Sequence, residues 1–236
     1  AKLMLKYLYK QSVVCGVLLG AWMPVFAQPA GTLYDPEPPA DSAYVRVVTA
    51  NHEERFDVHV DGKVRVKNLK AGSASEYMVL EAGQHSLAIR ASGKSQDRLV
   101  TTIDVARGSA VTVGFPTLKT GSQPIIFQDK TNSNKLKALL AIYHLDSNAG
   151  QVNVTSADGK TKVFSDLVFG KSASIQVNPI SIELLVTSAS DGALRGRPSL
   201  AMAQGAAYSI FLYADGSKKW ATHVQESKVE RYTKAQ

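Results

Sequence analysis

Two ten-residue stretches of this chain repeat each other, and the repetition constrains the fold more than any other feature. ARGSAVTVGF occupies residues 106–115 and AQGAAYSIFL occupies residues 203–212, 97 positions later. The letters DGK at 61–63 recur at 158–160, an offset of 97, and SAS at 73–75 recurs at 172–174, an offset of 99. Three landmarks at nearly one offset indicate that a domain of about 90 residues was duplicated. Such a period is too long for a solenoid, whose repeats span roughly 20–50 residues.

The pattern inside each copy is that of β-strands. In FDVHV, residues 56–60, the apolar side chains alternate with Asp57 and His59, as in a strand with one buried face. Asp61-Gly62 follows and predicts a two-residue hairpin, because a type I′ turn requires positive φ at both central residues. Turn signals recur every eight to twelve residues in both copies. The sequence therefore predicts an all-β fold of two tandem immunoglobulin-like β-sandwich domains.

The chain begins with a segment that has the pattern of a secretory signal. Lys2, Lys6 and Lys10 precede an apolar run of 16 residues that ends in Val25-Phe26-Ala27. This run is shorter than the roughly 20 residues that span a bilayer. We therefore predict a cleaved signal peptide and a periplasmic protein. The single cysteine, Cys15, lies inside the signal, so the mature chain has no disulfide, which fits a bacterial periplasm.

Composition divides the rest of the chain, because a proline-rich stretch precedes the first copy and a polar, turn-rich stretch separates the copies. The predicted parts are a signal peptide (1–27), a Pro-rich extended arm (28–42), a first β-sandwich domain (43–118), a linker (119–134) and a second β-sandwich domain with a C-terminal tail (135–236).

The net charge of +7 becomes +4 when the three signal lysines are removed, since 24 basic and 20 acidic residues remain. A mildly basic protein can bind an anionic partner but does not require one. A nucleic-acid-binding protein usually carries a denser basic stripe with aromatic residues beside it. We therefore predict no nucleic-acid partner.

The motifs of the common catalytic and metal sites are missing from the sequence. There is no G-x-S-x-G nucleophile motif and no glycine-rich phosphate loop. Ser73 and Ser172 occur in predicted turns before strands, where hydrogen-bonding serines are common. His59 and Asp61 could converge on one strand face, but no third ligand is evident. The sequence thus predicts no catalytic residue, no metal site and no cofactor.

One cluster of charged residues stands out as a candidate binding surface. Lys63, Arg65 and Lys67 alternate along the strand that follows the first DG turn. On a regular strand these side chains would form a short cationic ridge, suited to an anionic polysaccharide or an acidic protein surface. The alternative is an ordinary solvated face, or edge lysines that prevent strand pairing. The second copy keeps only Lys160 and Lys162, so the ridge would belong to the first domain.

A longer motif connects the chain to a known family. LYDPEPPADSAYVRVVTAN, residues 33–51, followed by the strand–turn–strand block, resembles the AlgF-like accessory proteins of alginate O-acetylation, which have relatives in cellulose-acetylation systems. The most specific positions are Leu33, Tyr34 and Arg46. Asp35 departs from the glycine that we expect in the alginate members, which leaves the polymer open.

This resemblance implies a non-catalytic periplasmic adaptor in the O-acetylation of a secreted exopolysaccharide. Its partners would be a membrane-bound O-acyltransferase and an SGNH-like periplasmic acetyltransferase, and linked weak sites would raise the effective affinity for them. The alternative is a pair of carbohydrate-binding modules that grip the polymer. Such modules usually carry a face of aromatic residues, whereas the aromatic residues here mostly occupy predicted core positions.

Overall fold

The structure is a computed structural model, and it describes residues 37–50, 54–214 and 219–233. These residues form seventeen β-strands. None of the described segments forms a helix with the length and apolarity needed to cross a membrane. The predicted signal peptide, most of the predicted arm, and the motif residues Leu33 and Tyr34 lie outside the described residues.

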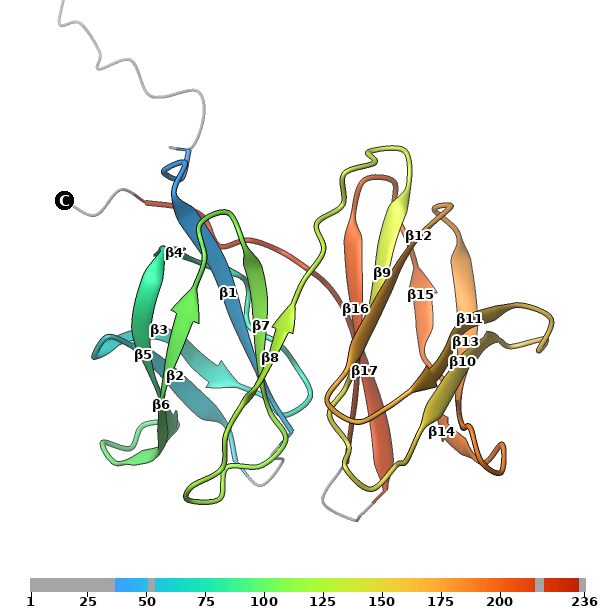
Figure 1. Ribbon diagram of the computed structural model, residues 1–236, viewed down its shortest axis with the longest axis horizontal. Helices are drawn as coiled ribbons and strands as arrows, with labels where there is room; N and C mark the ends of the chain where they lie inside the picture. Colours follow the sequence, from blue (N-terminus) through green and yellow to red (C-terminus); the bar gives the residue numbers. More distant parts are fainter. Residues whose placement is uncertain (1–36, 51–53, 215–218, 234–236) are drawn as a thin grey trace, which may run out of the picture. The chain divides into compact units, whose positions relative to one another are not determined.

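The first sandwich consists of two four-stranded sheets (Figure 1). One sheet has the order β4-β1-β7-β8, and we call it the inner sheet because it packs against the second sandwich. The outer sheet has the order β3-β2-β5-β6. The strands are β1 (Ser42–Thr49), β2 (Phe56–Val60), β3 (Lys63–Leu69), β4 (Met78–Glu81), β5 (Gly83–Ala91), β6 (Asp97–Val105), β7 (Ala110–Phe115) and β8 (Ile125–Gln128).

The second sandwich repeats this topology. Its inner sheet has the order β12-β9-β16-β17, and its outer sheet has the order β11-β10-β13-β14, with β15 also paired to β13. The strands are β9 (Ala138–His144), β10 (Val152–Ser156), β11 (Lys162–Leu167), β12 (Ser172–Val177), β13 (Ser181–Ser188), β14 (Leu194–Gly196), β15 (Ser199–Ala201), β16 (Ala207–Ala214) and β17 (Trp220–Glu226).

The two inner sheets also share an unusual pairing. β1 runs parallel to β7, and β9 runs parallel to β16, whereas all other strand pairs are antiparallel. The two repeated ten-residue stretches of the sequence carry β7 and β16. The prediction of two tandem β-sandwiches is therefore confirmed, and strand order and direction support the duplication.

Both outer sheets contain the same irregularity. In the first sandwich Asn68 has a positive φ of 56°, and its N–H donates to Oδ1 of Asp57 at 2.9 Å. In the second sandwich Asp166 has a φ of 54°, and its N–H donates to Oδ1 of Asn153 at 2.8 Å. Asn and Asp tolerate this backbone region better than other side chains do. Each pair stabilises a β-bulge, and the copies have exchanged the acid and the amide.

The two DG turns are less alike than the sequence suggested. Asp61 and Gly62 both have positive φ, as a type I′ hairpin requires. In the second copy only Gly159 has a positive φ, and the turn closes between Ser156 and Thr161 instead. The repeated letters DG therefore do not form the same turn in the second copy, where Asp158 turns the chain by accepting hydrogen bonds from Ser156 and Lys160.

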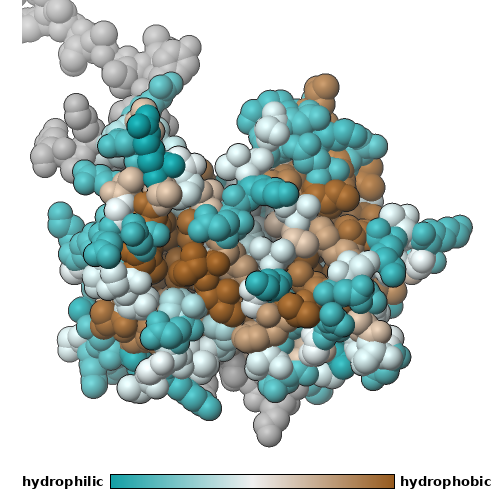
Figure 2. Space-filling view, viewed as in Figure 1, coloured by the Kyte–Doolittle hydropathy of each residue, from teal (hydrophilic) through white to brown (hydrophobic). Residues whose placement is uncertain are grey.

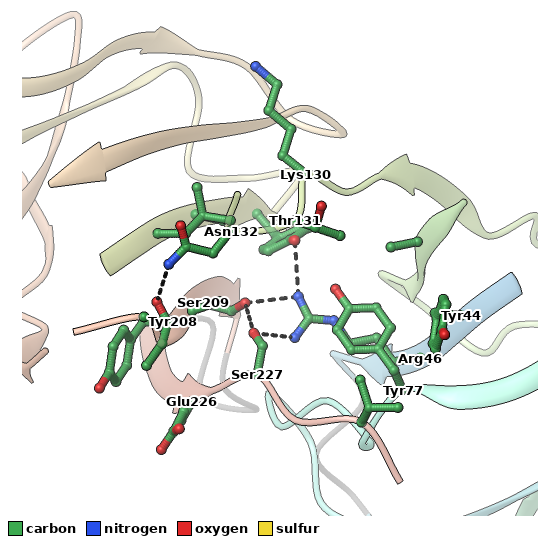
Figure 3. Close-up of a pocket in the computed structure, with 18 of the residues that line it drawn as sticks. Tyr44, Arg46, Tyr77, Lys130, Thr131, Asn132, Tyr208, Ser209, Glu226 and Ser227 are labelled. Carbon is green, nitrogen blue, oxygen red and sulfur yellow. Dashed lines mark hydrogen bonds between the residues drawn. The ribbon is translucent and has the colours of Figure 1, made fainter. Parts of the chain in front are cut away.

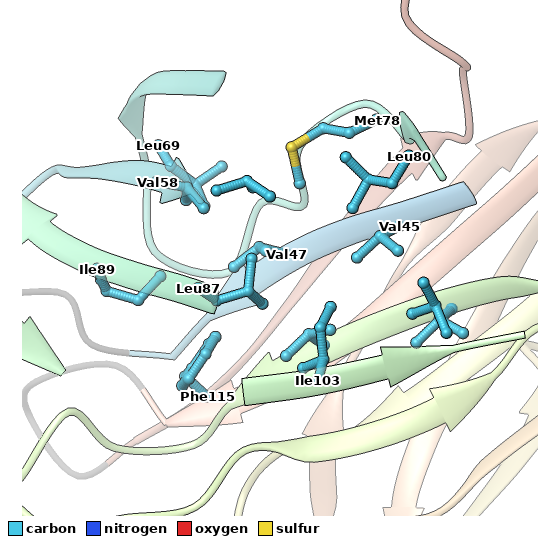
Figure 4. Packing of buried hydrophobic residues seen from close by; sticks show 14 of the residues in the cluster. Val45, Val47, Val58, Leu69, Met78, Leu80, Leu87, Ile89, Ile103 and Phe115 are labelled. Carbon is cyan, nitrogen blue, oxygen red and sulfur yellow. The ribbon is translucent and has the colours of Figure 1, made fainter. Parts of the chain in front are cut away.

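Each sandwich has its own apolar core. Figure 4 shows part of the first core, where Val47, Leu87 and Phe115 are fully buried between the two sheets. Leu184 occupies the place of Leu87 in the second core and is also fully buried. Burying a side chain of this size contributes about 1.5–3 kcal/mol. The alternating apolar positions of the sequence therefore explain both sandwiches.

The chain passes between the sandwiches twice. Its first passage follows β8, which completes the inner sheet of the first sandwich by pairing with β7. Its second passage follows β17, when the C-terminal tail returns to the first sandwich. There Tyr77 and Val229 form a parallel bridge, and Glu230 accepts a hydrogen bond from the N–H of Val79. The first sandwich is thus completed by contacts from a C-terminal tail that lies far away in the sequence.

Candidate functional site

The two inner sheets pack against each other through a third apolar cluster. Val48 and Phe127 come from the first sandwich, and Leu145 and Phe211 come from the second. Tyr143 stacks on Phe211 with ring centroids 5.0 Å apart and meets Phe127 edge-on at 5.2 Å. Aromatic pairs at these distances add stabilisation beyond the area that they bury. The sandwiches are therefore joined by a packed core and not by the linker alone.

A buried arginine lies beside this cluster. Arg46, in the middle of β1, is 1% exposed. Its Nε donates to the Thr112 hydroxyl at 2.8 Å, within the first sandwich. Its Nη2 donates across the boundary to the hydroxyls of Tyr143 at 3.0 Å and Ser209 at 2.8 Å, and its Nη1 donates to Ser227 at 3.0 Å. Burying a charge is costly unless it is hydrogen-bonded, and here all the recorded partners are hydroxyl groups.

A carboxylate compensates the charge of Arg46 indirectly, through hydrogen-bond partners that the two groups share. Asp129, which directly follows β8, accepts hydrogen bonds from Thr112 at 2.5 Å, Tyr77 at 2.6 Å and Tyr143 at 2.7 Å. Thr112 and Tyr143 therefore link the guanidinium group of Arg46 to the carboxylate. We call this cluster the polar joint, and it consists of Arg46, Tyr77, Thr112, Asp129, Tyr143, Ser209 and Ser227.

The tyrosines of the polar joint stay protonated, so they can donate to Asp129. Burial raises the pKa of Tyr143 to about 12, with the charge of Arg46 opposing the rise and that of Asp129 adding to it. Burial also raises the pKa of Tyr77 far above its usual range. The Tyr77 ring lies 4.6 Å from the guanidinium carbon of Arg46, which adds a cation–π contact.

A cavity of about 530 Å³ opens beside the polar joint (Figure 3). Arg46, Ser209 and Ser227 contribute to its wall, and Figure 3 shows the hydrogen bonds among them. The two chain passages between the sandwiches border it, through Lys130 on one passage and Ser227 on the other. The cavity has the size of a small-molecule or peptide site.

The predicted cationic ridge does not form a regular row. The pairing of β2 with β3 shifts register twice, and one shift lies between Val64 and Val66, so that Arg65 occupies a bulge. The bulge breaks the alternation that would have kept the three side chains on one face. Arg65 instead forms an ion pair with Glu230 of the C-terminal tail. Lys63 and Lys67 are exposed.

Of the three residues that carried the family resemblance, the structure describes only Arg46, at the centre of the polar joint. The sequence analysis did not single out its partners Tyr77, Thr112, Asp129 and Ser209. One signal was available, because Arg46 interrupts a strand whose other residues are almost all apolar. A buried arginine needs partners, but nothing in the sequence names them.

The structure brings one serine near a histidine. The Ser73 hydroxyl lies 3.3 Å from Nε2 of His223, across the boundary between the sandwiches. Burial and the charge of Lys70 lower the His223 pKa, and its side-chain partner is the amide of Gln225. The neighbouring backbone donors are already used, since the N–H of Gly72 donates to a Thr49 carbonyl, that of Ser73 to Lys70, and that of Ala74 to Gln225.

The described part of the chain contains no group of three or more His, Cys, Asp or Glu side chains placed to hold a metal ion. Asp61, considered above as a ligand beside His59, accepts hydrogen bonds from His85 at 2.6 Å and from the N–H of Ser86 at 2.9 Å. Its role is to hold the hairpin against β5.

Comparison with known proteins identifies the family. The family model described as "Alginate O-acetyl transferase AlgF" matches residues 16–209. The alginate biosynthesis protein AlgF of Pseudomonas aeruginosa is 25% identical over 215 residues, covering 87% of this chain and 88% of the relative. AlgF of Pseudomonas putida is 24% identical over 211 residues, covering 86% and 88%. The chain belongs to the AlgF family.

Among solved structures, the C-terminal domain of AlgF from P. aeruginosa matches with 22% identity and a TM-score of 0.33. The match covers 39% of this chain and 99% of that domain.

Proposed function

We propose that this protein is a non-catalytic periplasmic adaptor in the O-acetylation of a secreted, alginate-like exopolysaccharide. In this role it bridges a membrane-bound O-acyltransferase and an SGNH-like periplasmic acetyltransferase. The pathway is supported by family membership, because the curated relatives are named alginate biosynthesis proteins.

The polar joint is the observation that carries the adaptor role. An adaptor must hold two partners in a defined geometry, and a flexible linker would not do so. Here Arg46 alone donates three hydrogen bonds to the second sandwich, and Tyr143 returns one to Asp129. The inner sheets are used for this contact, so the two outer sheets face away from it and are available to different partners (Figure 1).

The surface offers apolar groups for such contacts. Figure 2 shows apolar residues gathered over the middle of both sandwiches on one face of the molecule. Large exposed apolar side chains include Ile126 on β8 and Ile175 on β12, which are 44% and 40% exposed. Both strands lie at the edges of their sheets. Edge strands with exposed apolar residues are common sites of protein–protein contact.

The surroundings of Ser73 support a non-catalytic role, although the family description names an O-acetyl transferase. Acyl transfer needs a nucleophile and donors that stabilise an oxyanion. Ser73 has a histidine neighbour, but the N–H groups of Gly72, Ser73 and Ala74 are all used inside the protein. None of these three N–H groups is therefore left to form an oxyanion hole.

A capture experiment tests the bridging role. The tagged protein is used to isolate partners from periplasmic and detergent-solubilised membrane extracts, and the partners are identified by mass spectrometry. Recovery of an O-acyltransferase or an SGNH-like acetyltransferase is the expected result. Recovery of polymer without either enzyme would contradict it and favour the carbohydrate-binding alternative.

A substitution tests the non-catalytic role separately. In a strain that lacks its own family member, Ser73→Ala is expected to restore polymer acetylation as well as the unchanged protein does. Loss of acetylation with normal protein levels, or acetyl transfer by the purified protein alone, would overturn the proposal.

The exposed lysines of β3 keep the role predicted for them as a hypothesis. The double substitution Lys63→Ala with Lys67→Ala should weaken capture of an anionic partner in a salt-dependent manner. Lys160→Ala with Lys162→Ala in the second copy is the matched control. Equal capture by both variants would remove β3 from the binding surface.

A further inference from the structure

We propose that the cavity beside the polar joint binds the C-terminal carboxylate of a partner polypeptide whose last side chain is apolar. This inference rests on the adaptor function proposed above and names the chemistry that one of its partners presents. It follows from three properties of the cavity, which are its unused cations, its satisfied polar groups and its apolar wall.

The first property is an excess of positive charge. Among the described residues that line the cavity, Arg46, Lys130 and Lys135 are cations and Glu226 is the one anion, and one positive charge remains even when Asp129, which compensates Arg46, is counted. Both lysines are exposed, so their ammonium groups can move to meet a ligand. The four hydrogen bonds of Arg46 use four of its five N–H donors and leave one on Nη1. Charge complementarity therefore favours a carboxylate.

The second property is that most polar side chains of the wall already have partners in the protein. Ser209 and Ser227 accept from Arg46 and bond to each other at 2.9 Å. The Tyr208 hydroxyl accepts from the N–H of Ala203. The Asn132 amide donates to the carbonyls of Lys137 and Ala206 and accepts from Gln176.

Because most polar side chains of the wall already have partners, two kinds of anionic ligand can be compared by the groups that they bring into the cavity. A uronate sugar carries a carboxylate but also several hydroxyl groups, and each hydroxyl buried without a partner costs about 1–3 kcal/mol. A peptide C-terminus also carries one carboxylate and adds backbone amide groups, but its last side chain can be apolar. That side chain distinguishes the two ligands, because a uronate has no apolar side chain to place against the wall of the cavity.

The third property is the apolar remainder of the wall. It is built mainly from small side chains, which leave room without offering hydrogen bonds: Ala110, Leu139, Ala141, Ala206, Ala207 and Val229. A volume of about 530 Å³ accepts a few residues and not a folded domain. A terminal apolar side chain against this wall, with its carboxylate toward the cations, would use both parts of the cavity.

A peptide array tests the proposal. Pentapeptides randomised at the last three positions are presented in two forms, with free C-terminal carboxylates and as amides, to the full chain. We expect retention of free-acid peptides that end in an apolar residue, at least tenfold above their amides. No enrichment over the amides, or stronger competition by uronate oligosaccharides than by the selected peptides, would overturn the proposal.

Variants of the full chain locate the site. Lys130→Glu with Lys135→Glu should lower affinity for the selected peptides at least tenfold, and Lys160→Glu with Lys162→Glu is the charge-matched control expected to bind within twofold of the unchanged chain. Ala207→Phe fills the wall without changing charge and should also abolish binding. Undiminished binding by both cavity variants would place the peptides elsewhere and refute the site.

The same variants separate this proposal from the adaptor function. If the Lys130 and Lys135 double variant captures the acetylation enzymes as well as the unchanged chain does, the cavity proposal fails and the adaptor role stands. If the unchanged chain captures neither enzyme, the adaptor role fails, and the array alone decides whether the cavity binds a carboxylate.

Discussion

The two sandwiches share one topology but contribute different chemistry to their contact. Arg46 and Tyr143 bond to each other but are not equivalent positions, because Arg46 lies opposite Thr112 of β7, whereas Tyr143 lies opposite Phe211 of β16 and not opposite Ser209, the counterpart of Thr112. Asp129 and Ser227 are equivalent, since each follows directly after the last strand of its sandwich. The polar joint therefore combines equivalent positions of the two copies with Tyr143, which has a different place in its strand.

The two copies differ in a way that makes the contact possible. The first sandwich supplies a cation and an anion, and the second supplies the hydroxyls of Tyr143, Ser209 and Ser227. A second arginine in place of one of these hydroxyl groups would have placed like charges together in a buried site, which is strongly unfavourable. After duplication, the difference between the copies allowed one to bind the other.

The same complementarity holds for size. Gly114 of β7 and Phe211 of β16 are also 97 positions apart. A Cβ atom at Gly114 would lie 2.8 Å from Leu145 and 2.9 Å from Phe127, so the first sandwich has no space there. Phe211 is fully buried in the apolar cluster that also contains Leu145 and Phe127. The same position of the two copies thus holds the smallest residue in one and a large ring in the other, as close packing of the contact requires.

Replacing the buried cation Arg46 should have the largest effect on the contact between the two sandwiches. We expect Arg46→Met to lower the free energy of unfolding by about 3–5 kcal/mol, because it removes the charge that compensates Asp129 and takes the donor away from four hydroxyl groups. Urea unfolding measures the loss. Arg55→Met is the control, since Arg55 bonds only an exposed Asn68 carbonyl among its recorded partners, and it should change stability by less than about 0.5 kcal/mol. A loss below about 1 kcal/mol for Arg46→Met would mean that the joint does not depend on this charge.

The size difference is tested by two opposite changes. Phe211→Ala removes a large buried ring and should cost about 3–4 kcal/mol. Gly114→Ala adds one carbon where Leu145 and Phe127 are too close, and should cost about 1–3 kcal/mol. Thermal unfolding compares the two variants with the unchanged chain. If Gly114→Ala is neutral, the packing at the joint is looser than the structure indicates.

The two cores offer a matched pair that sharpens the comparison. Leu87 and Leu184 are equivalent by sequence and are both fully buried. Leu87→Ala and Leu184→Ala should each cost about 3 kcal/mol, because each leaves a similar cavity. Urea unfolding followed by circular dichroism measures both. Losses that differ by more than about 2 kcal/mol would show that equivalent places in the two cores respond differently to a cavity.

The smallest expected effect concerns a titrating group that only the first copy has. Burial opposes the charged form of His85, but hydrogen bonds with Asp61 and with the Glu81 carbonyl outweigh it and raise the His85 pKa. A histidine whose pKa is higher in the folded than in the unfolded state stabilises the folded protein. This stabilisation is fully present below the unfolded pKa of about 6.5 and is lost as the pH rises through the folded pKa. The equivalent residue of the second copy, Ile182, cannot titrate.

The expected loss of stability between pH 5.5 and 8.5 is below about 1 kcal/mol, because the partner carboxylate is largely exposed. Urea midpoints at both pH values measure it, and His85→Gln should remove this part of the pH dependence. An NMR titration that places the His85 pKa below 6.5 would contradict the prediction.

The sequence by itself determined the strands, the first hairpin and, through the repeat, the presence of two like domains. The strands and the hairpin depend on interactions between residues near in the chain, such as the alternation of Phe56, Val58 and Val60 and the positive φ of Asp61-Gly62. Alternation and turn chemistry are local and can be read directly.

The tertiary structure alone decided the bulge at Arg65 and the polar joint. Arg46 donates hydrogen bonds to Ser209 and Ser227, which lie 163 and 181 positions away, and no periodicity in the sequence predicts such a contact. The physical reason is that a buried charge must be satisfied by whatever groups the packing brings near it. The sequence showed that an arginine occupies an apolar strand, and only the meeting of the two inner sheets determined its partners.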